Sequence, residues 1–196
     1  MNTLTAAHRG AGGRRLILLL TLALCAVPGC RQRAADSQPG GAPMSLQVTS
    51  TAFKEGETIP KQYTGDGADK SPPLRWSDPP DGTKSFALIC EDPDAPRRTF
   101  VHWVLFNVPA KARELPEGVP ARETLDDGSK QGKNDFGDLG FGGPSPPKGK
   151  PHRYYFKLYA LDTTLDLPAG ATAEQVRSAV AGHVLAEGQL MGRYQR

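Results

Sequence analysis

Two histidines each open an apolar run shortly after a proline-rich turn. His102 follows residues 92–96 (DPDAP), and His152 follows residues 143–147 (GPSPP). Proline fixes φ, so both turns stay stiff whether or not a ligand is bound. An imidazole can donate or accept a hydrogen bond, and it changes its charge near neutral pH. Two stiff turns that each lead to an imidazole predict a small, anion-sized pocket.

Two further side chains near these turns could take part in binding. Asp92 comes directly after the apolar run 85–91. Its carboxylate could fix a histidine tautomer, accept a hydrogen bond from a bound amine or alcohol, or cap the N–H groups of the turn, and capping is favoured from the residue alone. Tyr154 could hydrogen-bond a ligand oxygen or be an ordinary aromatic strand residue. Asp94 lies between two prolines, and we predict a structural role for it.

A single histidine or cysteine carries less information. A lone histidine in an apolar run is usually a satisfied core residue, and only their matching positions after stiff turns favour His102 and His152 as binding residues. His183 has no such loop, so a structural role in a helix is predicted. Cys90 ends an apolar run and is predicted to be a small buried hydrophobe rather than a nucleophile.

The N-terminus predicts export and a lipid anchor. Arg14 and Arg15 precede the apolar run 16–27, which has the charged start and short apolar centre of a signal peptide. Residues 26–30 (AVPGC) resemble a lipobox, so residues 1–29 are predicted to be a lipoprotein signal peptide and Cys30 to be lipidated. Signal cleavage that leaves a free Cys30, and a double-arginine export signal, are the alternatives. The predicted location is the periplasmic or cell-surface side of a membrane.

Charge and composition set the domain organisation. The chain has 24 Lys and Arg against 21 Asp and Glu, and the excess of three equals the basic residues Arg9, Arg14 and Arg15 of the signal peptide. The remainder is close to neutral, which excludes an electrostatic footprint for nucleic acid. Residues 30–44 have almost no large apolar side chains and are predicted to be a flexible tether. Residues 45–196 are predicted to be one domain.

Short apolar runs bounded by Pro, Gly and Asp predict strands in this domain. The one helix is predicted to begin at Thr172, whose hydroxyl can cap it, with Glu174 in its first turn and its end at Gly188. The fold class is therefore mainly β, an antiparallel β-sandwich with a C-terminal α-helix. Long Pro/Gly-rich loops, which usually carry function, are predicted at 64–73 and 128–151. The predicted strands are 46–53, 85–91, 102–108 and 154–161.

The order of several sequence blocks resembles one known family. Residues 63–67 (YTGDG), 71–76 (SPPLRW), 92–96 and 143–148 (GPSPPK) stand in the order found in the phosphatidylethanolamine-binding proteins, also called Raf kinase inhibitor-like proteins. The resemblance extends from about Leu46 to the C-terminus. It implies the same β-rich fold and a ligand pocket.

The resemblance also implies which residues line that pocket. They are Asp92, His102 and His152, with Tyr154 and the loop residues Ser145, Pro146 and Pro147. The family commonly has glycine at the position of Ser145, where a backbone N–H points at the phosphate of the ligand. A serine there either adds a hydroxyl donor or narrows the pocket. The resemblance further implies that Tyr194 closes the pocket and that the Ala95–Pro96 peptide is cis.

Three classes of function follow from these residues. The first is a non-catalytic binding protein for phosphate, a phosphorylated head group or a similar anionic ligand, with no cofactor or metal. The second is an inhibitor or regulator of a protein partner such as a protease or a kinase, as known for other family members. The third is a hydrolase, with zinc on Asp92, His102 and His152 or a triad that includes Ser145. Neither enzyme has its usual sequence signature, so the binding protein is predicted.

Overall fold

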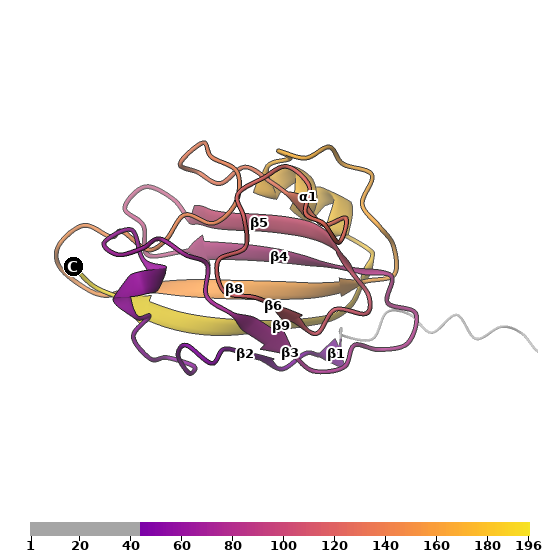
Figure 1. Ribbon diagram of the computed structural model, residues 1–196, viewed down its shortest axis with the longest axis horizontal. Coiled ribbons are helices and arrows are strands. Elements are labelled where there is room, and N and C mark those ends of the chain that lie inside the picture. Colours follow the sequence, from indigo (N-terminus) through magenta and orange to yellow (C-terminus); the bar gives the residue numbers. More distant parts are fainter. Residues whose placement is uncertain (1–43) are drawn as a thin grey trace, which may run out of the picture. The chain divides into compact units, whose positions relative to one another are not determined.

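The computed structural model describes residues 44–196, which form a mainly β structure with a short 3₁₀ helix, η1 (Lys61–Tyr63), and one short α-helix near the C-terminus (Figure 1). The predicted signal peptide, Cys30 and nearly all of the predicted tether lie outside the described residues. Within them, no helix has the length and apolar character needed to cross a membrane. The strands are β1 (Met44–Ser45), β2 (Val48–Thr49), β3 (Leu74–Trp76), β4 (Ser85–Asp92), β5 (Phe100–Pro109), β6 (Glu114–Leu115), β7 (Lys130–Gln131), β8 (His152–Leu161) and β9 (Val184–Tyr194).

These strands form two sheets. The larger sheet has the order β1-β9-β8-β4-β5-β7, and the smaller has the order β2-β3-β6. Every pairing is antiparallel except that of β1 with β9. The predicted mainly β fold with a C-terminal helix is therefore confirmed, while a complete β-sandwich stays a prediction.

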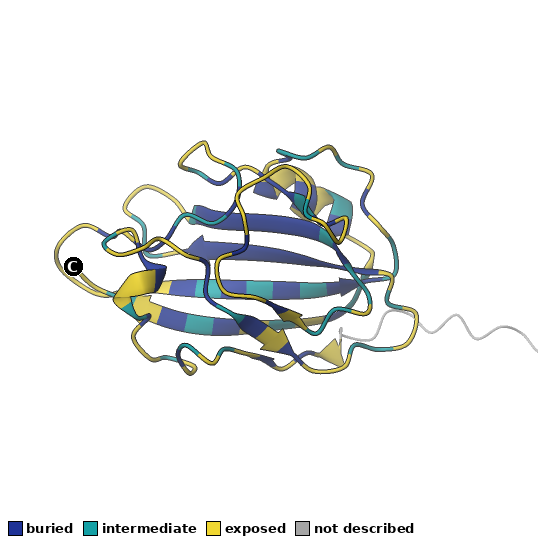
Figure 2. Cartoon of the chain, viewed as in Figure 1, coloured by how far each residue is buried: buried dark blue, intermediate teal, exposed yellow. Residues whose placement is uncertain are grey.

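The pleat of β4 explains why the predicted run 85–91 is apolar throughout. Successive side chains of a strand point to opposite faces. Phe86, Leu88 and Cys90 pack in a core cluster with residues of the small sheet, whereas Ala87 and Ile89 pack in a second cluster on the helix side. Figure 2 shows β4 and most of β5 buried along their length, while β8 alternates between buried and partly exposed residues.

Cys90 is fully buried in the first cluster and is a free thiol. Burial raises its pKa, and the neighbouring charges of Glu91 and Asp92 raise it further. A thiol with a raised pKa is a poor nucleophile, because the thiolate is the reactive form. The predicted role of a small buried hydrophobe is confirmed.

The helix α1 (Ala173–Val180) begins as predicted but ends early. The hydroxyl of Thr172 accepts a hydrogen bond from the backbone N–H of Gln175, and the Gln175 side chain accepts one from Thr172. This reciprocal capping box fixes the helix start. Val176 and Val180 are buried against the sheet, but the helix stops eight residues before Gly188, so the predicted end is wrong. His183 was predicted to lie in the helix, but it follows the helix in a turn because α1 ends at Val180. Its Nδ1 is 2.8 Å from Asp162 Oδ1.

Strand β9 is the longest strand and was not predicted from the sequence. It pairs with β8 along its whole length, from His152 opposite Tyr194 to Leu161 opposite Val184. Gly188, predicted as a helix end, lies inside this strand. A Cβ at Gly188 would lie 2.1 Å from the backbone oxygen of Leu46, so the glycine is needed for close approach of the edge segment.

Candidate functional site

The end of β4 meets the starts of β5 and β8, because both neighbours run antiparallel to it. Asp92 pairs with Phe100, and Glu91 pairs with Tyr155. A cavity of about 140 Å³ lies at this junction. The seven residues predicted to bind ligand all line it, together with four others. The full lining is Asp92, Ala95, Pro96, Phe100, His102, Phe136, Ser145, Pro146, Pro147, His152 and Tyr154.

Asp92 combines two of the roles considered for it. It is buried, with 3% of its surface exposed. Its Oδ1 accepts a hydrogen bond from the Asp94 backbone N–H at 2.8 Å, which caps the turn. Its Oδ2 lies 2.7 Å from Nδ1 of His152. Since a carboxylate only accepts hydrogen bonds, Nδ1 carries the proton, and Nε2 of His152 remains available to a ligand.

His102 is held in a matching way by the backbone. Its Nδ1 lies 2.6 Å from the carbonyl oxygen of Gly142, which can only accept, so Nδ1 donates. Among residues 44–196 no protein partner of Nε2 is found. Burial lowers the pKa of His102, and the Gly142 carbonyl and the charge of Asp92 oppose this only in part. His102 is therefore neutral at neutral pH, and its Nε2 presents a lone pair.

Tyr154 contributes a buried hydroxyl. Within the part of the chain that the structure describes, its oxygen has no hydrogen-bond partner. Burial raises the pKa of Tyr154 far above its usual range, and the charge of Asp92 raises it further. The hydroxyl thus keeps its proton. A buried polar group without a partner costs about 1–3 kcal/mol, which a ligand oxygen could offset.

Aromatic rings form the side of the cavity next to His102. The ring of Phe100 lies 5.1 Å from that of His102 and 4.7 Å from that of Phe136, and His102 meets Tyr154 edge to face at 5.1 Å. Phe136 is 49% exposed. Neither Phe100 nor Phe136 was predicted to line the cavity. Phe136 comes from a loop, and its approach to His102 is a tertiary contact that local sequence pattern does not predict.

The proline-rich wall is fixed by the turn at residues 64–69. The Gly143 N–H donates to Asp69 Oδ1 at 2.6 Å, and the Gly65 N–H donates to the Pro144 carbonyl oxygen at 3.0 Å. A Cβ at Gly143 would lie 2.4 Å from Asp69 Oδ1 and 2.8 Å from Thr64 Cα, so only glycine fits. The wall that carries Ser145 is thus held in place without a ligand.

Three further expectations have different outcomes. No peptide bond in residues 44–196 is cis, so the cis prediction for Ala95–Pro96 is wrong. Tyr194 does not line the cavity; its hydroxyl donates to Asp66 Oδ2 at 2.9 Å. Asp94 is also outside the cavity lining and binds the Arg153 guanidinium through both carboxylate oxygens, at 2.9 and 2.8 Å, which lowers the pKa of Asp94.

The arrangement differs from that of the two enzymes considered. In the described residues no group of three or more His, Cys, Asp and Glu side chains is placed to hold a metal ion. The hydrogen-bond partner of Ser145 Oγ is Arg196 Nη1, at 3.3 Å, rather than a histidine. The side chains around Ser145 therefore lack the nucleophile–base contact that a hydrolase triad requires.

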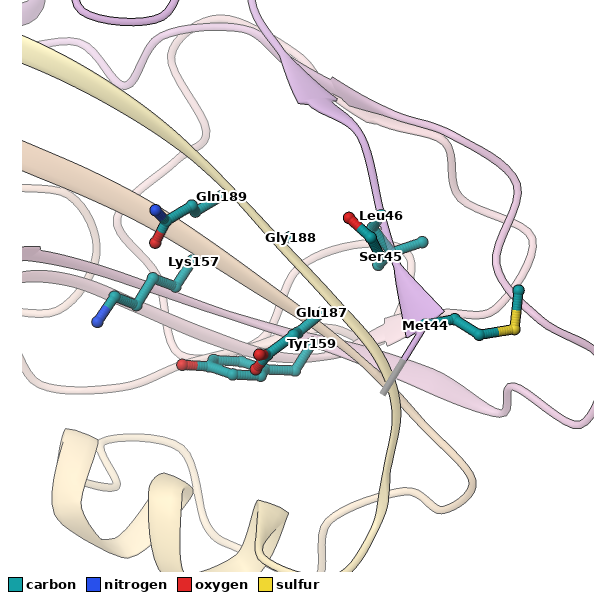
Figure 3. A pocket seen from close by; sticks show the side chains of 8 residues that line it. All are labelled: Met44, Ser45, Leu46, Lys157, Tyr159, Glu187, Gly188 and Gln189. Carbon is teal, nitrogen blue, oxygen red and sulfur yellow. The ribbon is translucent and has the colours of Figure 1, made fainter. Parts of the chain in front are cut away.

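A larger hollow of about 450 Å³ lies elsewhere, over β1, β8 and β9 (Figure 3). Its polar side chains form cross-strand pairs, Lys157 opposite Gln189 and Tyr159 opposite Glu187. The ammonium of Lys157 is already paired with Glu91. Because ligand sites combine a defined cavity with a few convergent polar groups, the smaller cavity with its unused histidine nitrogens is the candidate site.

The fold defines a mainly β protein with a small cavity that two histidines line, and comparison with known proteins gives its family. The sequence profile of the phosphatidylethanolamine-binding proteins matches residues 49–195. The chain belongs to this family.

Its relatives cover the same region. A UPF0098 protein of Methanothermobacter thermautotrophicus is 52% identical, over 77% of this chain and 99% of the relative, and one of Aquifex aeolicus is 50% identical, over 80% and 91%. Among solved structures, a putative phosphatidylethanolamine-binding protein homologue of Chlamydia trachomatis is 41% identical with a TM-score of 0.71, covering 78% of this chain and 98% of its own. Escherichia coli YbcL, described as a member of the mammalian family, is 38% identical with a TM-score of 0.72, covering 78% and 99%.

Proposed function

We propose that this protein is a non-catalytic binding protein whose cavity holds a phosphate or phosphomonoester group, either free or as a lipid head group. Family membership supports a binding protein. The observation that carries the finer proposal is the convergence of polar atoms without protein partners in one small cavity. These are Nε2 of His102, Nε2 of His152 and the hydroxyl of Tyr154, all in the part of the chain described.

The size of the cavity limits the ligand. Its volume is about 140 Å³. Since one water takes about 30 Å³ in the liquid, the cavity has room for a few water-sized groups, which suits a phosphate group but not an acyl chain. A longer ligand would leave its remainder at the mouth, beside the half-exposed ring of Phe136.

The protonation states favour a singly protonated phosphate. The neutral His102 presents a lone pair on Nε2, so it needs a donor, which the P–OH of a phosphate monoanion supplies. The Tyr154 hydroxyl can donate to a charged phosphate oxygen. Nε2 of His152 is the third polar atom available to the ligand, while Nδ1 remains paired with Asp92. The monoanion of a phosphomonoester has one P–OH and two oxygens that share the negative charge, so it can satisfy His102 and Tyr154 together.

Isothermal titration with inorganic phosphate and O-phosphoethanolamine tests this proposal. Wild-type protein should bind both. His152→Ala and Tyr154→Phe should each weaken binding by roughly 1.5–3 kcal/mol, the range for a hydrogen bond to a charged group. His183→Ala is the matched control, because His183 is exposed and bonded to Asp162 outside the cavity. Absence of binding by the wild type, or wild-type affinity in both cavity variants, would refute the proposal.

A further inference from the structure

Asp66, in the block 63–67 that the sequence analysis singled out, connects the last residues of the chain to the wall of the cavity. It does not line the cavity itself. Its Oδ2 accepts the hydroxyl hydrogen of Tyr194 at 2.9 Å, and its Oδ1 pairs with Nη2 of Arg196 at 2.8 Å. The Asp66 side chain is 20% exposed and that of Arg196 is 42% exposed, so only the carboxylate side of this ion pair is shielded from solvent.

The same guanidinium reaches the cavity wall. Nη1 of Arg196 donates to Ser145 Oγ at 3.3 Å, and Ser145 lines the cavity. A serine hydroxyl has one hydrogen and two lone pairs. Once a lone pair is engaged by Arg196, the hydroxyl hydrogen must turn toward another acceptor. No protein acceptor for it occurs among the described residues. Because Ser145 is exposed, the hydrogen points to water in the free protein and can turn to a ligand oxygen in the cavity.

The position of Ser145 is fixed independently of Arg196. The Gly65 N–H binds the Pro144 carbonyl, and a Cβ at Gly65 would lie 3.2 Å from the Ser145 Cβ. Prolines on both sides of Ser145 stiffen this wall further. Removal of the Arg196 guanidinium should therefore leave the wall in place and change only the orientation of the hydroxyl.

We propose that Arg196 is a positioning residue for ligand binding: held by Asp66, it orients the Ser145 hydroxyl as a hydrogen-bond donor toward an oxyanion in the cavity. The inference rests on the proposed function. It gives a role to the serine at the position where the family commonly has glycine. It also predicts that the site prefers an oxyanion over an uncharged ligand of equal size, because a fixed donor gains most from a charged acceptor.

Phosphate titrations of single and double variants test the proposal. Ser145→Ala removes a hydrogen bond to a charged oxygen and should lower the phosphate affinity about tenfold or more. Arg196→Gln leaves the hydroxyl but frees it to rotate, and should lower the affinity about two- to fivefold. In the Ser145→Ala background, Arg196→Gln should have no further effect. Asp66→Asn, which breaks the same ion pair, should behave like Arg196→Gln.

Arg97→Gln is the matched control for the loss of one positive charge. Arg97 is exposed, directly follows the cavity residue Pro96, and has no ion-pair partner among residues 44–196. Its replacement should leave the phosphate affinity unchanged. Thermal unfolding of every variant, without ligand, should give melting temperatures close to that of the wild type.

The possible results separate the two proposals. If the wild type does not bind phosphate, the proposed function fails. If the wild type binds but Arg196→Gln has wild-type affinity, only the positioning role is overturned. If Arg196→Gln lowers the phosphate affinity equally with and without the Ser145 hydroxyl, the effect is a simple charge effect and the positioning role is overturned. The same holds if Arg97→Gln lowers the phosphate affinity as much as Arg196→Gln does.

Discussion

The two cavity histidines differ in what fixes them, and this decides their chemistry. A carboxylate holds Nδ1 of His152, whereas a backbone carbonyl holds Nδ1 of His102. A protonated His152 forms an ion pair with Asp92. A protonated His102 would be a buried cation whose Nδ1 partner is an uncharged carbonyl, and burial accordingly lowers its pKa. The matching sequence positions of these residues therefore do not imply matching hydrogen-bond partners.

The lowered pKa of His102 predicts how stability depends on pH. A histidine whose pKa is lower in the folded state contributes its full stability above its unfolded pKa of about 6.5. This contribution is lost as the pH falls, because the unfolded chain binds the proton more tightly, with a slope of at most about 1.4 kcal/mol per pH unit. Denaturant unfolding between pH 7.5 and 5 in phosphate-free buffer should show this loss in the wild type.

The same series with His102→Gln provides the control. Glutamine can still donate to the Gly142 carbonyl but does not titrate. The free energy of unfolding of this variant should fall less steeply over the same pH range. Equal slopes in the two proteins would contradict a buried neutral His102.

The affinity for a phosphomonoester should rise as the pH falls, whereas the stability of the protein falls. A phosphomonoester changes from dianion to monoanion below its second pKa of about 6, which provides the P–OH donor that the lone pair of His102 needs. O-phosphoethanolamine should therefore bind more tightly at about pH 5.5 than at about pH 8, measured by titration calorimetry. Stronger binding at pH 8 would indicate that the dianion is the preferred ligand.

At the level of elements, the sequence predicts β4, β5 and β8 well but misses β9, although β9 also lies between two strands. β4, β5 and β8 are central in the large sheet, so their apolar runs are continuous or regular. β9 is interrupted by Gly188 and Gly192, which resemble strand breakers. In the structure a side chain would not fit at either position, because Leu46 lies against the backbone of Gly188 and Ile59 lies against that of Gly192. A glycine required by a neighbour that is distant in sequence cannot be distinguished from a turn glycine by local pattern.

The candidate site was also predictable only in part. The seven predicted residues share one cavity because their turns join strands that the sheet places side by side. The aromatic wall was not predictable, since Phe136 reaches His102 only through the folding of a long loop. The early end of α1 was also missed, because the strand after it contains helix-compatible residues such as Leu185, Ala186 and Glu187.

Gly188 gives an element-scale test. Gly188→Ala would place a Cβ 2.1 Å from the backbone oxygen of Leu46, so the edge segment must move. We expect a loss of about 1–3 kcal/mol in the free energy of unfolding, the usual cost of overpacking. Glu187→Ala, at an exposed position of the same strand, should change it by less than about 0.5 kcal/mol. Equal stability of Gly188→Ala and the wild type would contradict the close approach.

At the scale of the whole molecule, two apolar clusters lie on opposite faces of the large sheet, and the cavity lies where its central strands end. Tyr154 belongs to the first cluster and also lines the cavity, so the core itself supports the candidate site. Under the proposed function, a cavity supported in this way need not order a loop before it binds its ligand. Such preorganisation reduces the entropy cost of binding.

The location of this domain depends on the N-terminal segment, and we propose that Cys30 carries a lipid that anchors the protein to a membrane. The apolar run 16–27 is shorter than the roughly 20 residues that cross a bilayer, so without lipidation it would not hold the chain. Cys30→Ser should therefore shift the full-length protein from the membrane fraction to the soluble fraction on cell fractionation, and mass spectrometry should show the acyl mass only in the wild type. Cys25→Ser, inside the predicted signal peptide, is the matched control and should leave the protein in the membrane fraction. Membrane retention of Cys30→Ser equal to that of the wild type would refute the lipid anchor and favour another mode of attachment.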